Sequence, residues 1–233
     1  MISFIVPAHN EEALLGRTLE ALHGSAGQVG KPYEIVVVND ASTDRTGEIA
    51  IKHGARLVSL DRRQIAAARN AGAGVAAGDT FIFVDADTMI TEPALRMAVQ
   101  ELESGAVGGG ASIRFDGDPL PLYAQILERV LSPTLQLLRL APGCFLFCTR
   151  KTYLAAGGFD EALFVAEEVS FARRLKQQGR FVILREFVIT SARKLRTRSA
   201  FQLLWIGLRL AIGGGKSIRR RAGLEYWYGP REA

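Results

Sequence analysis

Residues 81–87 read Phe-Ile-Phe-Val-Asp-Ala-Asp, and this stretch decides the fold class of the chain. Its first four residues are aromatic or β-branched, which predicts a short buried strand. Two acids separated by one alanine end that strand. If extended geometry continued, alternation would turn Asp85 and Asp87 to the same side. Ligands of open α/β sheets bind just beyond the carboxyl ends of the strands, which is where these acids fall.

The two acids also indicate a type of chemistry. Hard divalent cations such as Mg²⁺ or Mn²⁺ prefer carboxylate oxygens as ligands. They often bind a substrate phosphate at the same time. Asp85 and Asp87 therefore predict a metal-assisted site for a phosphorylated, nucleotide-bearing substrate. The alternative is a polar loop whose acids cap a turn or the next helix, and an Asp-x-Asp pair taken alone favours that alternative.

Strand and helix patterns alternate on both sides of this stretch. Short apolar strands are predicted at 2–6, 33–38, 56–60 and 80–84, with helices over 11–22, up to 53, and over 64–77. This alternation predicts βαβ units: a Rossmann-like, mostly parallel sheet with helices on both faces. The second half is less regular, with helices predicted over 93–103, 120–140 and 168–178 and strands over 105–115, 143–149 and 181–188.

The composition fits one large α/β domain. The chain has 233 residues, of which 48% are hydrophobic and 23% charged, enough for a sizeable core. Cys144 and Cys148 are too far apart along a strand to bridge comfortably and have no histidine neighbours, so free thiols are expected rather than a disulfide or zinc site. The start of the chain lacks a signal-peptide pattern and no apolar run reaches membrane-spanning length, so we expect a cytoplasmic protein.

The net charge of +5 is concentrated late, between residues 173 and 221. A basic end indicates anionic partners such as phosphates or acidic lipid headgroups, or simply a solvated face. No nucleic-acid-binding signature accompanies it, so nucleic acid is not expected as a partner. An apolar stripe over 199–212 precedes three arginines at 219–221, which suits peripheral attachment to the inner face of a membrane, or packing on the domain or on a second subunit in a homodimer. We expect one domain over 1–190 and a helical, basic C-terminal extension over 191–233.

The motifs that carry a family resemblance occur in order along the chain. They are SFIVPAHNEE (3–12), IVVVNDASTD (35–44), ARNAG (68–72), GDTFIFVDAD (78–87), GGFDE (157–161) and AEEVS (166–170). With these motifs the chain resembles the glycosyltransferase family 2 enzymes, nucleotide-sugar-dependent transferases with the GT-A fold, over about residues 1–185. The resemblance implies a UDP- or GDP-sugar donor and a hydroxyl acceptor, for which a lipid-linked molecule stays open.

The resemblance also implies roles for residues at matching positions. The residues that would bind the donor nucleotide and its sugar are Pro7, Ala8, Asn10, Glu11, Asp40, Arg69 and Asp85. Asp40 would accept a hydrogen bond from a ring N–H of the base, and Asp85 would face the ribose or sugar. Asp87 would ligate Mg²⁺ or Mn²⁺ at the donor diphosphate, where the metal neutralises charge on the leaving group.

The catalytic base is implied at Glu168, which would deprotonate the acceptor hydroxyl as it attacks the anomeric carbon with inversion. Relatives usually have Glu-Asp where this chain has Glu167-Glu168. The longer side chain moves the carboxylate by about one bond, a displacement that matters in catalysis. Glu167 therefore stays open as the base, and so does a purely structural role for both acids at a helix N-terminus.

A second departure concerns the metal. Many relatives place a metal-binding histidine after this helix, whereas the chain has histidines only at positions 9, 23 and 53. One alternative is that Asp87, the diphosphate and water suffice as ligands. The other is that basic residues after position 190 supply positive charge directly; these are Arg193, Lys194, Arg196 and Arg198.

Two rival functions remain at this level. A nucleotidyltransferase would need a glycine-rich basic loop after the first strand, where residues 7–12 are acidic instead. A non-catalytic nucleotide-binding or scaffold protein of transferase ancestry is the other rival, because a fold does not secure a function.

Overall fold

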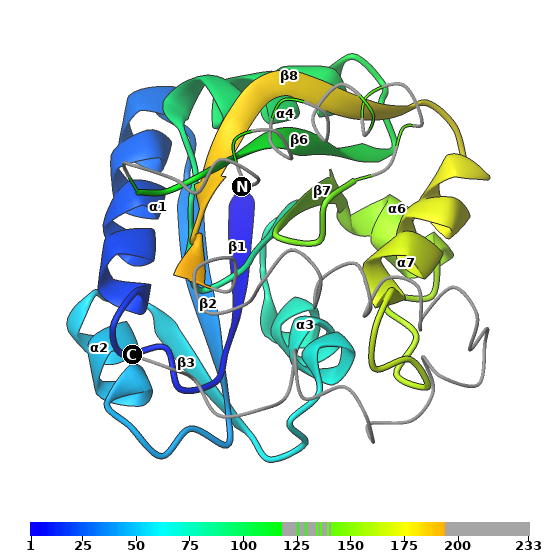
Figure 1. Cartoon of the computed structure of the whole chain (residues 1–233). Coiled ribbons are helices and arrows are strands. Elements are labelled where there is room, and N and C mark those ends of the chain that lie inside the picture. Colours follow the sequence, from blue (N-terminus) through cyan, green and yellow to red (C-terminus); the bar gives the residue numbers. More distant parts are fainter. Residues whose placement is uncertain are drawn as a thin grey trace.

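The computed structural model describes residues 1–117 and 141–193, together with positions 125, 129, 134, 136 and 139. In this part of the chain one sheet has the strand order β3-β2-β1-β4-β7-β6-β8-β5 (Figure 1). The strands are β1 (Ile2–Ala8), β2 (Tyr33–Asp40), β3 (Arg56–Leu60), β4 (Thr80–Val84), β5 (Thr88–Met89), β6 (Gly108–Phe115), β7 (Phe145–Thr149) and β8 (Phe181–Thr190). The helices are α1 (Leu15–Val29), α2 (Thr46–Lys52), α3 (Ile65–Val75), α4 (Glu92–Glu103), α6 (Arg150–Ala155) and α7 (Glu167–Lys176).

The first half of the chain forms the predicted parallel part of the sheet. Strand β1 pairs in parallel with both β2 and β4, and β3 adds in parallel to β2. Parallel neighbours need crossover connections, which the helices between them supply. The carboxyl ends of β1, β2 and β4 therefore meet at one edge of the sheet.

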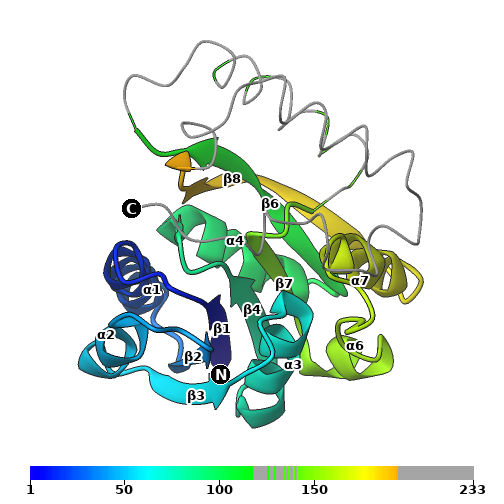
Figure 2. The same ribbon diagram turned by 60° about the horizontal axis from the view of Figure 1, so that its bottom comes forward.

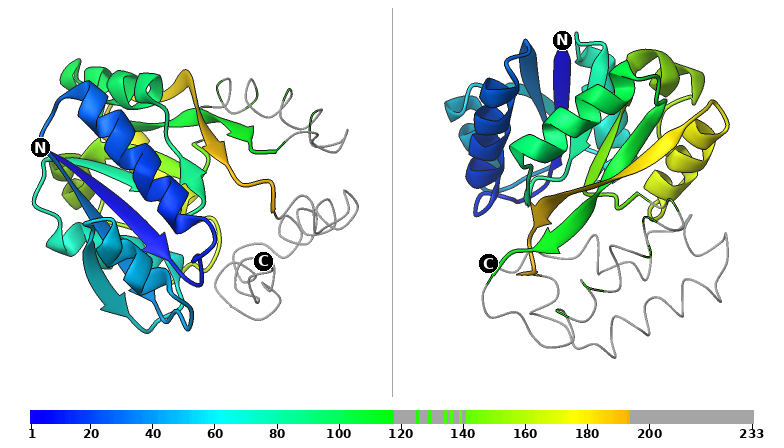
Figure 3. Two further views of the ribbon diagram at one scale, coloured as in Figure 1. Left: turned by 90° about the vertical axis from the view of Figure 1, so that its left-hand side faces the viewer. Right: turned by 90° about the horizontal axis from the view of Figure 1, so that it is seen from above.

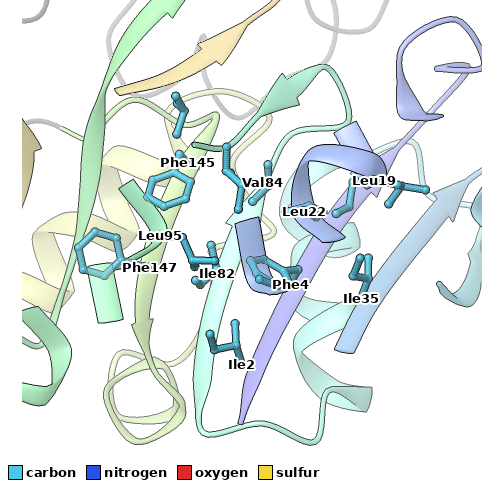
Figure 4. Close-up of a cluster of buried hydrophobic side chains, with 14 of the residues drawn as sticks. Ile2, Phe4, Leu19, Leu22, Ile35, Ile82, Val84, Leu95, Phe145 and Phe147 are labelled. Carbon is cyan, nitrogen blue, oxygen red and sulfur yellow. The ribbon is translucent and has the colours of Figure 1, made fainter. Parts of the chain in front are cut away.

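Helices cover both faces of the sheet, as predicted. Along β1, Phe4 faces one core with Leu19 and Leu22 of α1 (Figure 4), whereas Ile5 faces a second core that includes Phe171 of α7. Figures 2 and 3 show α1 and α4 on the first face and α3, α6 and α7 on the other. Coverage on both faces explains why the parallel strands are almost continuously apolar.

The second half makes the sheet mixed. Strand β7 is antiparallel to β4 and to β6, β8 is parallel to β6, and the short β5 is antiparallel to β8. Strand β6 begins with glycines because its neighbours are close. A Cβ at Gly109 would lie 2.3 Å from the carbonyl oxygen of Val182 and 2.5 Å from Cζ of Phe147. The fold is thus the predicted α/β type with a mostly parallel sheet, and every antiparallel pair in the described part of the chain includes β7 or β8.

Several boundaries differ from the sequence prediction. Helix α1 begins at Leu15 rather than at 11, because the preceding residues form a loop that is tied to the end of β2. The predictions over 120–140, 199–212 and 219–221 lie outside the described residues, apart from the isolated positions named above. Among the described helices, none has the length and apolar character needed to cross a bilayer.

Candidate active site

A cavity of about 320 Å³ opens at the carboxyl ends of β1, β2 and β4. The predicted site residues that line it are Pro7, Ala8, Glu11, Asp40, Arg69, Asp85, Asp87 and Glu168. Asn10 is the predicted residue that is missing from its walls. Groups far apart in the sequence therefore converge on one hollow, as the parallel strand ends require.

The loops after β1 and β2 are fixed to each other beside the cavity. Asn10 accepts a hydrogen bond from the backbone N–H of Thr43 at 2.8 Å, and its own N–H donates to the hydroxyl of Ser42 at 3.0 Å. Asn10 and Ala41 both have positive φ, at 51° and 57°. The amide of Asn10 thus holds the loops in place, which explains its absence from the cavity wall.

Asp40 organises the opposite side of the site. Its carboxylate accepts hydrogen bonds, each 2.8 Å long, from the backbone N–H groups of Arg62, Arg63 and Gln64. Arg63 has a φ of 46°, so this short loop is strained as well as tightly bound. A carboxylate has about four acceptor positions, and Asp40 at the cavity wall therefore retains capacity for one more donor.

Arg69 is the centre of a buried ion cluster. Its Nη1 donates to Oε1 of Glu167 at 2.8 Å, and its Nη2 donates to Oδ1 of Asp85 at 3.0 Å and to the carbonyl oxygen of Gly143 at 2.8 Å. The Arg69 side chain is 1% exposed. We call Arg69, Asp85 and Glu167 the Arg69 cluster. Burial lowers the pKa of Arg69, but the surrounding carboxylates outweigh burial and raise that pKa, so the arginine stays charged.

The two acids at the start of α7 have different surroundings. Glu167 is buried against Arg69, and burial together with the charge of Glu168 raises the pKa of Glu167 to about 8. Glu168 lines the cavity and contacts Gly143, where a Cβ would lie 3.3 Å from Cδ of Glu168. Ala166, the residue before the helix, has a positive φ of 63°. At this turn Glu167 is buried and Glu168 half-buried, and both line the cavity.

A second arginine, Arg193, lies beside Asp87, the other acid of the Asp-x-Asp pair. Nη2 of Arg193 donates to both carboxylate oxygens of Glu11, at 3.0 and 2.9 Å, and lies 3.9 Å from Oδ2 of Asp87. We call Arg193, Glu11 and Asp87 the Arg193 cluster. Among the basic residues proposed from sequence to supply charge, Arg193 lies beside Asp87, and Lys194, Arg196 and Arg198 lie outside the described residues.

The carboxylates can accommodate a divalent cation only with help from other ligands. No group of three or more His, Cys, Asp or Glu side chains within the described residues could hold a metal. Asp85 and Asp87 both line the cavity, and Mg²⁺ commonly combines one or two carboxylates with phosphates and water. Burial and the charges of Asp85 and Asp87 raise the pKa of the nearby Cys144 thiol, and Mg²⁺ or Mn²⁺ prefers oxygen ligands to sulfur.

Some supporting residues were not singled out from the sequence. Gly143 provides the carbonyl that holds Arg69. Asn70, beside Arg69, donates to the carbonyl of Phe159 and accepts from the hydroxyl of Tyr153. The Phe159 ring lies 5.2 Å from the Arg69 guanidinium. The motif at 157–161 is therefore packed against the Arg69 cluster, a role that needs the tertiary structure to be seen.

A mixed sheet of this order, with paired acids after its central strand and a cavity at the strand ends, defines a GT-A type protein. Solved structures of that type align with the chain. A TarS fragment from S. aureus in complex with UDP aligns with a TM-score of 0.61 at 22% identity, covering 82% of this chain and 60% of the other. The mannosyltransferase PcManGT from Pyrobaculum calidifontis, in complex with GDP-Man and Mn²⁺, aligns with a TM-score of 0.67 at 20% identity, covering 90% and 64%. At these identities the likeness establishes the fold.

Sequence comparison establishes the family. The profile of "Glycosyl transferase family 2" matches residues 3–154, more than half of the chain, and the chain therefore belongs to this family. It is 36% identical over 96 residues to the glycosyltransferase GlyA of Streptococcus pneumoniae, covering 39% of this chain and 13% of that protein. It is 34% identical over 94 residues to an undecaprenyl-phosphate 4-deoxy-4-formamido-L-arabinose transferase of Pectobacterium carotovorum, covering 37% and 28%. The chain thus matches well under half of either relative.

Proposed function

We propose that the chain is an inverting glycosyltransferase that moves a sugar from a UDP- or GDP-linked donor to a hydroxyl acceptor with the help of Mg²⁺ or Mn²⁺. The observation that carries this proposal is that Asp40, Asp87 and Glu168 line one cavity. A base-binding acid, a metal-binding acid and a general base are thereby within reach of a single ligand. UDP and GDP-Man are bound by the structural neighbours named above.

The donor nucleotide would lie between the loops after β1 and β2. The acceptor position that Asp40 retains would take a ring N–H of the base, while its other positions keep the loop over residues 62–64 in shape. Asp85 would meet the ribose or sugar from a fixed position because Arg69 holds it. Little side-chain freedom would be lost on binding, which favours affinity.

Asp87 would hold the divalent cation, together with diphosphate oxygens and water. When bound, such a cation neutralises charge that develops on the leaving nucleoside diphosphate. The backbone carbonyl of Asp87 accepts a hydrogen bond from the Ser191 N–H after β8, which holds the Asp87 backbone beside the cavity.

Glu168 would act as the base. Both glutamates line the cavity, but Glu167 is buried and hydrogen-bonded to Arg69, whereas Glu168 is half-buried. The pKa of Glu167 is raised to about 8, so Glu167 is protonated near neutral pH. Glu168 therefore has no second negative charge beside it. Glu168 would take the proton of the acceptor hydroxyl while that oxygen attacks the anomeric carbon from the face opposite the diphosphate.

The basic charge late in the chain favours an anionic acceptor. The segment over 173–221 is strongly basic, and an undecaprenyl-phosphate transferase is among the relatives. A lipid-linked hydroxyl or phosphate acceptor at a membrane surface fits both facts, with the extension over 191–233 supplying the contact. The division at residue 190, the cytoplasmic location and a homodimer stay predictions.

The test combines binding with turnover. UDP or GDP with Mn²⁺ should raise the melting temperature, since a ligand stabilises the state that binds it. Glu168→Gln should keep this shift yet release nucleoside diphosphate from UDP- or GDP-sugars about 10²–10⁴-fold more slowly than wild type. Glu101→Gln, which alters a half-buried partner of Arg180 away from the cavity, is the matched control and should leave both the shift and the release rate at their wild-type values.

Each alternative outcome has a distinct meaning. If no nucleotide shifts the melting temperature, the transferase proposal fails. Binding without turnover for any tested sugar donor would identify a non-catalytic nucleotide-binding protein. Turnover that survives Glu168→Gln but not Glu167→Gln would move the base to Glu167.

A further inference from the structure

The Arg193 cluster places a permanent cation at the carboxylate that is proposed to bind the metal. The contact is built into the fold. Strand β5 pairs with the end of β8, the Ser191 N–H donates to the carbonyl of Asp87 at 3.1 Å, and the Ala192 N–H donates to Oδ1 of Asp116 at 2.7 Å. Arg193 therefore follows directly on a backbone that is fixed next to Asp87.

The charges of this cluster are shielded from water. The side chains of Arg193, Glu11 and Asp87 are 15%, 4% and 18% exposed. In such surroundings electrostatic interactions are stronger than in bulk water. A dication bound to Asp87 without other ligands would lie close to the Arg193 guanidinium and be repelled by it. A nucleoside diphosphate brings several negative charges, which both cations can share.

Arg193 also has the chemistry to bind a phosphate. Its contacts to Glu11 and Asp87 are all made by Nη2. A guanidinium has five N–H donors and matches phosphate oxygens in a fork geometry. Contact with the two carboxylates therefore does not exhaust its capacity, and a diphosphate at Asp87 would lie beside it.

We propose that Arg193 makes metal binding dependent on the diphosphate: it weakens the affinity of Asp87 for a free divalent cation and itself supports the diphosphate when no metal is present. This inference rests on the proposed function, since it requires a nucleoside diphosphate in the cavity. Arg193 acts on the metal through Asp87 and is in that respect a positioning residue. The substrate class it favours is the metal–diphosphate complex over the metal alone.

The experiment measures two affinities on the full chain. Binding of Mn²⁺ alone is followed by the electron paramagnetic resonance signal of free Mn²⁺, and binding of UDP and of GDP in excess chelator is followed by calorimetry. Arg193→Gln should bind Mn²⁺ alone at least about tenfold more tightly than wild type and the diphosphate in chelator at least about tenfold more weakly. Arg193→Lys keeps the charge and should return the Mn²⁺ affinity towards the wild-type value.

The matched control is Arg180→Gln, at the other end of β8, which removes an arginine paired with Glu101. It should change neither affinity. If Arg193→Gln does not fold, Glu11→Gln makes the same test with opposite signs: Arg193, released from Glu11, should bind the diphosphate in chelator more tightly and further weaken Mn²⁺ binding.

The opposite directions of the two changes separate this role from a structural one. A loss of both affinities together in Arg193→Gln would mean that Arg193 only supports the fold, and unchanged affinities would mean that it faces neither ligand. Either result overturns the inference while leaving the transferase proposal intact, provided that UDP or GDP still binds with Mn²⁺. Failure of both nucleotides to bind wild type with Mn²⁺ overturns the proposed function and the inference with it.

Discussion

The Arg69 cluster and the Arg193 cluster hold two acids that are only two positions apart, yet they differ in depth. Arg69 is 1% exposed and lies between Asp85 and Glu167, whereas Arg193 is 15% exposed and lies between Glu11 and Asp87. Each arginine joins one acid of the pair to a glutamate from another part of the chain. Neighbouring acids in one motif are thus held by different arginines, Asp85 by the more deeply buried Arg69 and Asp87 beside the less buried Arg193.

A turn produces this separation. Strand β4 ends at Val84, and the Thr88 N–H donates to the carbonyl of Asp85 at 3.0 Å. Extended geometry therefore does not continue through the pair, and strand alternation does not set the directions of the two side chains. Both acids still line the same cavity.

Removing Arg69 should have the largest effect. Arg69→Met removes the buried donor shared by Asp85, Glu167 and the Gly143 carbonyl and leaves these acceptors unpaired, so unfolding free energy should fall by about 3–5 kcal/mol. Urea denaturation measures this directly. Arg96→Met, which breaks an exposed pair with Glu92 on α4, is the control and should cost less than about 1 kcal/mol. Equal losses in the two variants would contradict the burial of the Arg69 cluster.

The pH dependence of the unfolding free energy should report the ionisation of Glu167. Its folded-state pKa of about 8 lies above the value of about 4.3 for an unfolded glutamate. The folded protein therefore holds a proton that the unfolded chain loses, so this stabilisation is complete below about pH 4.3 and disappears as pH rises through about 8. Between pH 6 and pH 9 wild type should lose on the order of 2 kcal/mol.

Glu167→Gln is neutral at every pH and should flatten that decline, as measured by urea midpoints at pH 6, 7, 8 and 9. Glu101→Gln, at a half-buried position away from the cavity, should keep the wild-type slope. An unchanged slope in Glu167→Gln would mean that Glu167 is ionised throughout this range.

The Arg193 cluster should show the smallest effect on stability. In a double-mutant cycle, Glu11→Gln and Arg193→Gln should couple by about 1–2 kcal/mol, because the two residues are in contact but Arg193 is less buried than Arg69. Thermal denaturation of both single variants and the double variant gives the coupling. Additive effects would show that the ion pair contributes nothing to the folded state.

The sequence predicted the sheet type and the group of residues that meet at its edge, because strand ends follow from local apolar patterns. It could not predict what each side chain does there. Asn10 matched a donor-binding motif, and in the structure its amide oxygen accepts a hydrogen bond from Thr43 in the loop after β2, outside the cavity wall. The contact of Arg193 with Glu11 joins residues 182 positions apart, and no local pattern reports it.

The backbone around the cavity carries a consequence of its own. Asn10, Ala41, Arg63 and Ala166 all have positive φ, a conformation that costs energy in residues other than glycine. Because folding already meets that cost, these loops are held in a defined shape, and we expect a ligand to require little reorganisation of them. Glycine at Ala41 or Ala166 would relax the chain locally and make the same loops more mobile. We then expect a more stable protein that binds its ligand with lower affinity.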